Sequence, residues 1–156
     1  MTRLAERLAA DGWTCRTGGA RGADQAFMNG AGEQVELYLP WPRFNGLEHI
    51  KRVKLTSPTL EAYDIARLLH RAWQHRAWNA RALHGRNVHL VLGVQCKEPV
   101  DMLVCWTPDG AIEFEDTDPE TGGTGMAIRV ARQWRVPVRN LQRADHRAAA
   151  EQYLTS

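Results

Sequence analysis

Two glycine-rich segments, each between an apolar run and a helical pattern, constrain the fold of this chain most. The first reads TCRTGGARGAD (14–24) and the second reads ETGGTGMAIRVA (120–131). A strand that passes through a tight turn into a helix is the repeating unit of a parallel α/β sheet. Because parallel strands end at one edge of their sheet, both turns are expected at that edge, within reach of one ligand.

The remaining pattern predicts strands and helices in alternation along one domain, residues 1–156. Strands are expected over 13–16, 35–41, 88–92, 101–107 and 136–141, with a strand-like piece at 53–55. Helices are expected over 3–10, 22–31, from Ser57–Pro58 to His70, from His75 to His84, over 123–134 and over 143–154. The runs 88–92 and 101–107 are continuously apolar, which is typical of parallel strands covered on both faces. The fold class predicted is therefore α/β, a Rossmann-like, mostly parallel sheet flanked by helices.

The segment after Ser57 carries two local predictions. Ser57 is expected to cap a helix, with Pro58 at its first helical position and Ala62, Ile65, Ala66 and Leu69 facing inward. An unbroken helix would bury Arg76 without a partner and point Trp78 away from the core. Since a buried unpaired arginine is costly, a break is expected between His70 and His75. The alternative is one long helix whose Trp78 is covered by a partner.

Each glycine turn places backbone N–H groups at a helix start, where they can bind phosphate or carboxylate. Neither turn is a standard fingerprint: GGARG is not GxGxxG, and no GK[ST] follows, so a usual dinucleotide site or ATPase loop is not indicated. One alternative is two tight turns without a ligand. The other, which two turns at one edge favour, is a shared ligand site.

Several side chains near the turns have two interpretations each. Arg21 reaches an anion or is a solvated loop residue, and Asp24 caps its helix or binds a ribose hydroxyl. Arg129 faces either the shared ligand site of the two turns or water. Trp106 stacks on a base or covers the core. The residues that can add hydroxyl donors are Thr17, Thr121 and Thr124.

Charge is unevenly distributed, although the net charge is only +2. Residues 65–97 contain five arginines, one lysine, four histidines and no acid, whereas 98–128 contain eight acids and no lysine or arginine. The blocks are either solvated faces that meet, within the chain or across a dimer, or a basic wall for an anionic ligand. The acidic loop, 108–120, matches no metal motif, so no metal site is predicted.

The three cysteines are not paired as CxxC, and each lies in or beside an apolar run. Buried thiols in a reducing, cytoplasmic compartment are expected, rather than a disulfide framework or a zinc site. No apolar run approaches the ~20 residues of a membrane helix, and the amphipathic start is not a signal peptide. No membrane partner is expected.

The segments TGGARGADQAF, RNVHLVLG, PVDMLVCWTPDG and GGTGMAIRVARQWRVPVRNL together resemble the SLOG superfamily. This Rossmann-like group of nucleotide-associated domains includes the DNA-processing protein of natural transformation and the Lonely Guy phosphoribohydrolases. The likeness is greatest to small bacterial and phage members related to YspA and YpsA, and it covers residues 13–141. The resemblance implies a nucleotide-like ligand bordered by Gly18, Gly19, Ala20, Arg21, Gly22, Asp24, Trp106, Thr107, Gly122, Gly123, Thr124 and Gly125.

The chain departs from the superfamily in two respects. Members usually begin with a strand and a short loop before the first helix, whereas this chain begins at that helix. Either the start is truncated or the sheet lacks its central strand. The Lonely Guy enzymes carry a motif similar to PGGxGTxxE, in which the glutamate is catalytic. The corresponding segment here, TGGTGMAIR, has Ile128 at the position of that glutamate.

The function expected is therefore binding or sensing of a nucleotide or a nucleotide-derived molecule. One alternative is hydrolysis of an N-glycosidic or phosphate bond, with acids such as Asp24 and Asp101 near the crevice. Another is binding of single-stranded DNA through the arginines of 67–86 with Trp73 and Trp78, although helical spacing spreads these arginines around the axis. A homo-oligomer, with a dimer favoured, is expected from Trp78 and the opposed charge blocks. The sequence identifies no particular cofactor.

Overall fold

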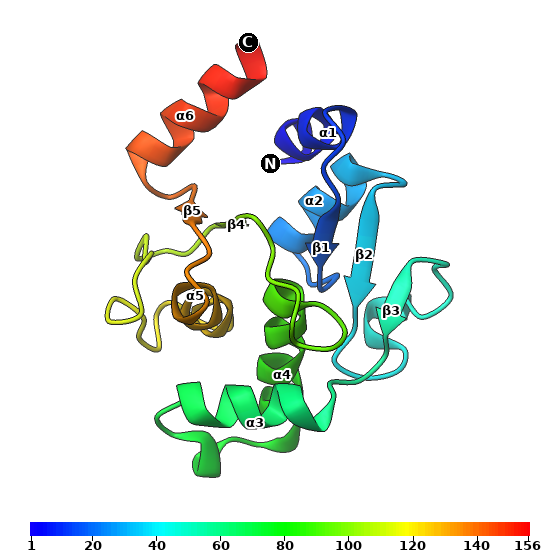
Figure 1. Cartoon of the computed structure of the whole chain (residues 1–156), viewed down its shortest axis with the longest axis vertical. Helices are drawn as coiled ribbons and strands as arrows, with labels where there is room; N and C mark the ends of the chain where they lie inside the picture. Colours follow the sequence, from blue (N-terminus) through cyan, green and yellow to red (C-terminus); the bar gives the residue numbers. More distant parts are fainter.

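The computed structural model describes the whole chain, Met1 to Ser156, as alternating helices and short strands (Figure 1). The helices are α1 (Thr2–Ala10), α2 (Ala23–Ala31), α3 (Leu60–Leu69), α4 (Trp78–Leu92), α5 (Thr124–Gln133) and α6 (Ala144–Thr155). The strands are β1 (Cys15–Thr17), β2 (Val35–Tyr38), β3 (Val53–Leu55), β4 (Leu103–Cys105) and β5 (Val138–Asn140). Two 3₁₀ turns, η1 (Phe44–Gly46) and η2 (Trp73–His75), complete the elements.

All strand pairs are parallel, but they form two sheets. One has the order β1-β2-β3 and the other the order β4-β5. Cys15 pairs with Val35 in the first sheet, and Leu103 pairs with Val138 in the second. The predicted α/β class with parallel strands is thus confirmed. The expected single sheet is interrupted between β1 and β4, which pair with β2 and β5 but not with each other.

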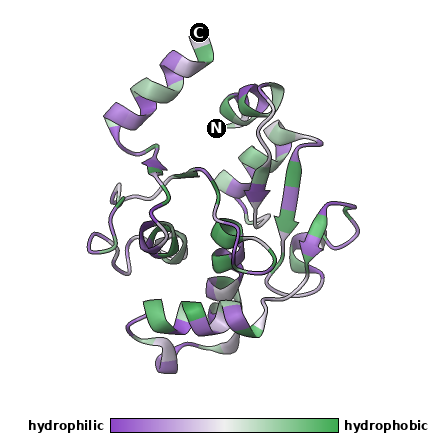
Figure 2. Ribbon diagram, in the orientation of Figure 1, coloured by the Kyte–Doolittle hydropathy of each residue, from purple (hydrophilic) through white to green (hydrophobic).

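The main hydrophobic core lies around α3, α4, α5 and the two-stranded sheet. It contains 15 buried residues, against three in the cluster beside β1 and β2. Figure 2 shows the apolar colour concentrated on the part of α4 nearest the strands and on β2. Ala62 and Ala66 of α3 are fully buried, and Ile65 and Leu69 pack against the same core. The predicted inward face of α3 is confirmed.

The predicted strand 88–92 is wrong, because these residues form the last turns of α4. Val88, Val91 and Leu92 are fully buried and His89 is 1% exposed. This end of α4 lies between the strands and α3, and only Leu90 of these residues is half-buried (Figure 1). A short apolar run does not distinguish a buried strand from a buried helix, and here the helical pattern from Trp78 continues through it. The predicted helix end at His84 is wrong for the same reason.

The break before α4 is confirmed. α3 ends at Leu69, and α4 begins at Trp78 after the turn η2. Arg76 lies in the connection and is exposed, which agrees with the cost of burying it. The predicted cap at Ser57 is wrong: Thr59 is the N-cap of α3, and its hydroxyl accepts a hydrogen bond from the Ala62 N–H at 3.3 Å.

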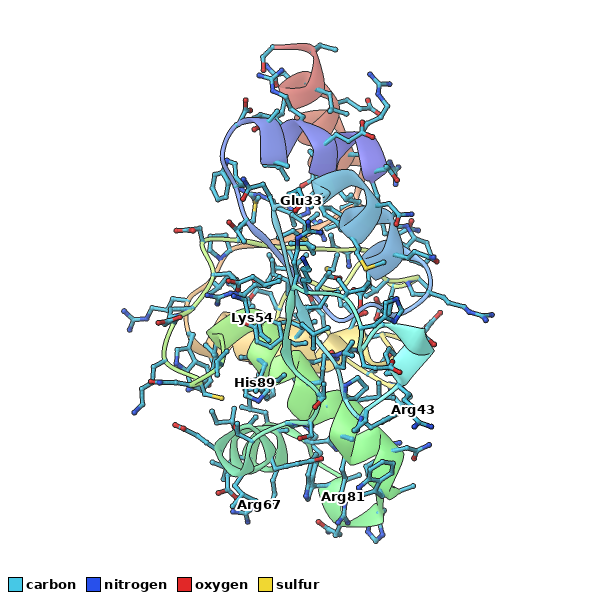
Figure 3. All side chains as sticks on the ribbon, turned by 90° about the vertical axis from the view of Figure 1, so that its right-hand side faces the viewer. Glu33, Arg43, Lys54, Arg67, Arg81 and His89 are labelled. Carbon is cyan, nitrogen blue, oxygen red and sulfur yellow. The ribbon has the colours of Figure 1, made fainter.

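His89 connects α4 to its two neighbours. Its Nε2 accepts the Thr59 N–H at 3.1 Å, and its ring stacks on Tyr38 of β2 with centroids 6.0 Å apart. Figure 3 shows His89 where α4 passes between the strands and α3. These contacts fix α4 against β2 and the start of α3. No helix of the chain is both long and apolar enough to cross a bilayer.

Candidate functional site

The first glycine turn connects β1 to α2, as the sequence predicts. Gly19 and Gly22 have φ of +66° and +94°, values that glycine adopts without strain. The Asp24 carboxylate, in the first turn of α2, accepts the Ala20 N–H at 3.2 Å and so holds the turn closed. The backbone N–H groups of Gly19 and Gly22 donate no hydrogen bond within the chain. The turn therefore presents unpaired donors at the start of a helix.

The second glycine turn leads into α5. Gly122 has φ of +69°, and Gly123 is the N-cap residue of the helix. The Asp118 carboxylate accepts the backbone N–H groups of the two residues before Gly122. The Gly125 N–H is also used, because it donates to the Gly122 carbonyl. The N–H groups of Gly123 and Thr124 remain without partners in the chain.

Two adjacent residues of α4 connect the glycine turns. The Arg86 guanidinium donates to the Gly18 carbonyl, and the Asn87 amide donates to the Gly123 carbonyl at 2.8 Å. Arg86 also donates from Nε to Asn87 Oδ1 at 2.9 Å. One polar chain therefore runs from the first turn to the second. We use the name glycine crevice for the two glycine turns together with Arg86 and Asn87.

Arg86 is the buried charge of the glycine crevice. It is 4% exposed, and its nearest carboxylate, that of Asp24, lies 4.0 Å away. Its guanidinium also lies over the Phe44 ring, 5.7 Å from the ring centroid. Burial lowers the pKa of Arg86 from its ordinary value, and the Asp24 charge opposes this shift. A guanidinium this far from water, with no close ion pair, is stabilised by an added anion.

An aromatic cluster, Trp41, Phe44 and Trp78, borders the first turn. The Trp41 ring centroid lies 5.2 Å from that of Phe44 and 5.6 Å from that of Trp78, and Trp78 is 67% exposed. The cluster is fixed to the turn because the Asn45 side chain donates to the Gly19 carbonyl at 3.0 Å. A planar apolar surface therefore adjoins the buried charge.

Thr107 lies in a polar network behind the second turn. It is 1% exposed, and its hydroxyl donates to the Asp109 carboxylate at 2.6 Å. Thr121 donates to the same carboxylate, and Asn140 Nδ2 donates to Thr107. Partial burial acts to raise the pKa of Asp109, but the two hydroxyl hydrogen bonds outweigh it and the pKa falls below its ordinary value. Thr107 and Thr121 therefore anchor the loop that carries the turn.

The other predicted site residues lie in different surroundings. Thr17 is buried and donates its hydroxyl to the Asp24 carbonyl at 3.4 Å. Arg21 is exposed and forms no ion pair, and Trp106 is 45% exposed after β4. Arg129 is not directed at the crevice: it donates to the Thr117 hydroxyl at 2.6 Å and to the Leu69 carbonyl at 3.1 Å.

No ion pair joins the two charge blocks in the structure. Each ion pair of the basic segment 65–97 is local or crosses to the first turn, as between Arg67 and Asp64 and between Arg86 and Asp24. The acidic segment pairs with other parts of the chain, as Glu98 does with Arg16 and Glu113 with Arg132. Within one chain, the prediction that the two faces pair with each other is wrong.

Sequence reasoning missed Arg86 and Asn87 as members of the site. Both lie between the predicted helix end at His84 and the predicted strand at Val88, so they were expected in a connection. The signal that would have found them is a polar pair inside an otherwise apolar stretch, since buried polar groups require specific partners.

Comparison with known proteins gives no relative for this chain: no family model, no curated protein and no solved structure matches it.

Proposed function

We propose that this protein binds a nucleotide or a nucleotide-derived molecule in the glycine crevice and acts as a binding or sensing domain. The observation that carries the proposal is Arg86, a buried guanidinium that contacts the first turn and is connected through Asn87 to the second. A buried cation beside two helix starts favours the binding of an anion, because the cation and both helix N-termini stabilise negative charge.

The phosphate of such a ligand has donors from both turns. The unpaired N–H groups of Gly19, Gly22, Gly123 and Thr124 belong to the starts of α2 and α5 or to the turns before them. Backbone donors bind phosphate without a lysine, which this crevice lacks. Arg21, exposed on the first turn, adds a second cation that is free to move toward a bound anion.

The aromatic cluster favours a nucleotide over a bare phosphate. A nucleobase stacks on exposed indole rings, and Trp78 offers such a ring close to the first turn. The resemblance to the SLOG superfamily supports the same ligand class, and we propose membership of that superfamily on the motifs of the two turns.

Binding is favoured over hydrolysis by the residue in the catalytic position of the Lonely Guy motif. Ile128 occupies it and is fully buried in α5, so no carboxylate is available there. Asp24 accepts the Ala20 N–H and faces Arg86, which gives it a role in holding the turn. Release of a free base or of ribose phosphate from any nucleotide would favour the hydrolase instead.

Two arginines of residues 65–97 are already engaged within the chain, which favours a small ligand over single-stranded DNA. Arg86 is buried, and Arg81 donates to the backbone carbonyls of Trp73 and Gln74. Arg67 and Arg81 lie at the α3 end of the molecule, away from the strands (Figure 3). This arrangement supports the small-ligand proposal.

Isothermal titration with AMP, ADP, ATP, ADP-ribose and inorganic phosphate tests the proposal. Gly123→Asp places a carboxylate at the start of α5, where it favours the helix dipole but repels an anion. Gly123→Ala is the matched control, because an added Cβ there meets no atom within 4 Å. We expect a nucleotide to bind the parent and Gly123→Ala proteins, and to bind Gly123→Asp at least about tenfold more weakly.

The proposal is wrong if no nucleotide binds, or if Gly123→Asp binds as tightly as Gly123→Ala. Sedimentation of the same samples with and without nucleotide measures the oligomeric state. A dimer is our expectation.

A further inference from the structure

A cavity of about 580 Å³ lies between the two sheets, beside the first glycine turn, whose Thr17 and Asp24 also line it. Its two sides are β1, with Cys15, Arg16 and Thr17, and β4, with Leu103 and Val104. Figure 1 shows these strands at neighbouring edges of the separate sheets. The space is therefore bounded by strand edges as well as by side chains.

The free edge of β1 follows from its hydrogen bonds. The Cys15 N–H donates to the Gln34 carbonyl at 2.8 Å, so Cys15 and Thr17 direct their backbone groups toward β2. In a parallel strand alternate residues point to opposite sides. The backbone N–H and C=O groups of Thr14 and Arg16 therefore point away from β2, and both residues line the cavity.

The free edge of β4 follows in the same way. The Leu103 N–H donates to the Pro137 carbonyl at 2.9 Å, and the Cys105 carbonyl accepts from Leu141 at 2.8 Å. The intervening groups, those of Met102 and Val104, point away from β5, and these two residues also line the cavity. Two rows of unpaired backbone donors and acceptors thus border one space.

The two faces of this space are covered. Leu8 and Ala9 of α1, with Phe27 and Ala31 of α2, form one wall. Leu90 at the end of α4, with Pro99 and Val100, forms the other, and the Arg16 guanidinium donates to the Glu98 carbonyl at 2.7 Å beside it. An inner strand of a parallel sheet has this environment, with a strand on each side and an apolar layer above and below.

We propose that this space, the strand slot, accepts an extended segment of a partner polypeptide, which adds a strand between β1 and β4 and joins the two sheets. Pairing with an open edge is a recurring mode of peptide recognition. An unprotected edge is normally covered or paired, and here two such edges lie on one cavity. The inference does not depend on the nucleotide proposal.

The lining specifies the chemistry of the segment. Apolar walls require apolar side chains on both faces of the added strand, over about four to six residues at ~3.3 Å each. The charged groups at the margin include the carboxylates of Asp11, Asp24 and Asp101. The cation at the margin, Arg16, is already paired with a carboxylate of the chain. Asp101 is exposed and forms no ion pair, so a lysine or arginine flanking the apolar run completes the match.

A synthetic peptide tests the proposal on the full chain. The probe is acetyl-Lys-Arg-Val-Ile-Val-Val-Thr-amide, and the measurement is amide hydrogen exchange resolved by residue. At saturation we expect the Arg16 and Val104 amides to exchange at least about tenfold more slowly. The amides of Cys15 and Leu103, which already donate to the carbonyls just before β2 and β5, are the internal reference.

Two controls separate strand addition from nonspecific adhesion. The same peptide with proline in place of its central isoleucine and the next valine lacks two N–H donors, and we expect no protection from it. Asp101→Lys weakens binding of the basic peptide about twofold to fivefold, and a peptide with Glu-Glu in place of Lys-Arg restores it.

The proposal is overturned if a saturating peptide leaves both amides unprotected, or if the proline peptide protects them equally. It is also overturned if these amides become protected without peptide as the protein concentration rises, because a second copy of the chain would then fill the slot.

Discussion

The two halves of the molecule differ in how much apolar surface each buries. The half built from α3, α4, α5, β4 and β5 has a continuous core of 15 residues, while the half built from α1, α2 and the three-stranded sheet has a cluster of three. The halves meet at polar contacts, such as Arg86 to Gly18 and Arg16 to Glu98, and where His89 stacks on Tyr38. Stability therefore resides in one half, and the glycine crevice lies where the two halves meet.

This difference in buried apolar surface bears on the proposed sensing function. A region with few buried apolar contacts opens at lower free energy than a full core does. A ligand that contacts both turns is bound by both halves at once, so its binding free energy adds to the contacts between them.

The largest expected effect is in the main core. Leu92→Ala removes a fully buried side chain and should lower the free energy of unfolding by about 3 kcal/mol. Leu37→Ala, in the small cluster, should cost less, about 2 kcal/mol, since a cluster of three residues can collapse around the gap. Urea denaturation measures both. An equal or larger loss for Leu37→Ala would contradict the division into a strong and a weak half.

The contact between the halves gives the second prediction. Arg86→Met keeps an apolar chain of similar length but removes the hydrogen bonds to Gly18 and Asn87. We expect a loss of about 2 kcal/mol in stability and the loss of nucleotide binding. Arg81→Met is the matched control on the same helix, with an expected change within about 0.5 kcal/mol. If both variants behave alike, Arg86 does not join the halves.

The start of α3 gives a smaller effect. Thr59→Ala removes the hydroxyl that caps the helix and should cost about 1 kcal/mol, whereas Ser57→Ala should leave the thermal midpoint unchanged. Thermal denaturation of the two single variants compares them. A larger effect at Ser57 would restore the cap predicted from the sequence.

The smallest effect concerns pH. Burial lowers the pKa of His84 to about 4, and its neighbour His70, 4.6 Å away between ring centroids, adds to the shift. The unfolded chain binds the proton near the ordinary value of 6.5, so stability is complete above pH 6.5 and falls as pH decreases toward 4. Denaturation of His84→Gln across this window should show a shallower pH slope than the parent. An identical slope would show that His84 is not protected from protonation.

The sequence was sufficient for elements whose local signals agree with their packing. The first strand–turn–helix unit, the break before Trp78 and the inward face of α3 each combine a clear period with a turn or a costly burial. The second glycine turn begins α5 as predicted, but the loop 106–123 separates it from β4. The segment 88–92 could not be assigned in this way, because a short run of apolar residues fits a buried strand as well as a buried helix. Its assignment depends on α4 being covered by elements distant in the sequence.

The candidate site was only partly predictable. Glycines at a strand-to-helix turn indicate free N–H groups, so both turns could be found from the sequence. The role of Arg86 could not be predicted. Arg86 lies in the continuous helix α4, but the sequence pattern placed it between the end of one helix and the start of a strand. The direction of the Arg129 side chain could not be predicted either. Its guanidinium donates to Thr117 and Leu69 instead of reaching the crevice.

The most direct test of the central claim is a titration of the ¹⁵N-labelled protein with ADP, followed by amide NMR shifts at both glycine turns. One ligand that bridges the crevice should move the amides of Gly19, Gly22, Gly123 and Thr124 together, with one dissociation constant. Movement at one turn alone, or at neither turn, would contradict a shared site.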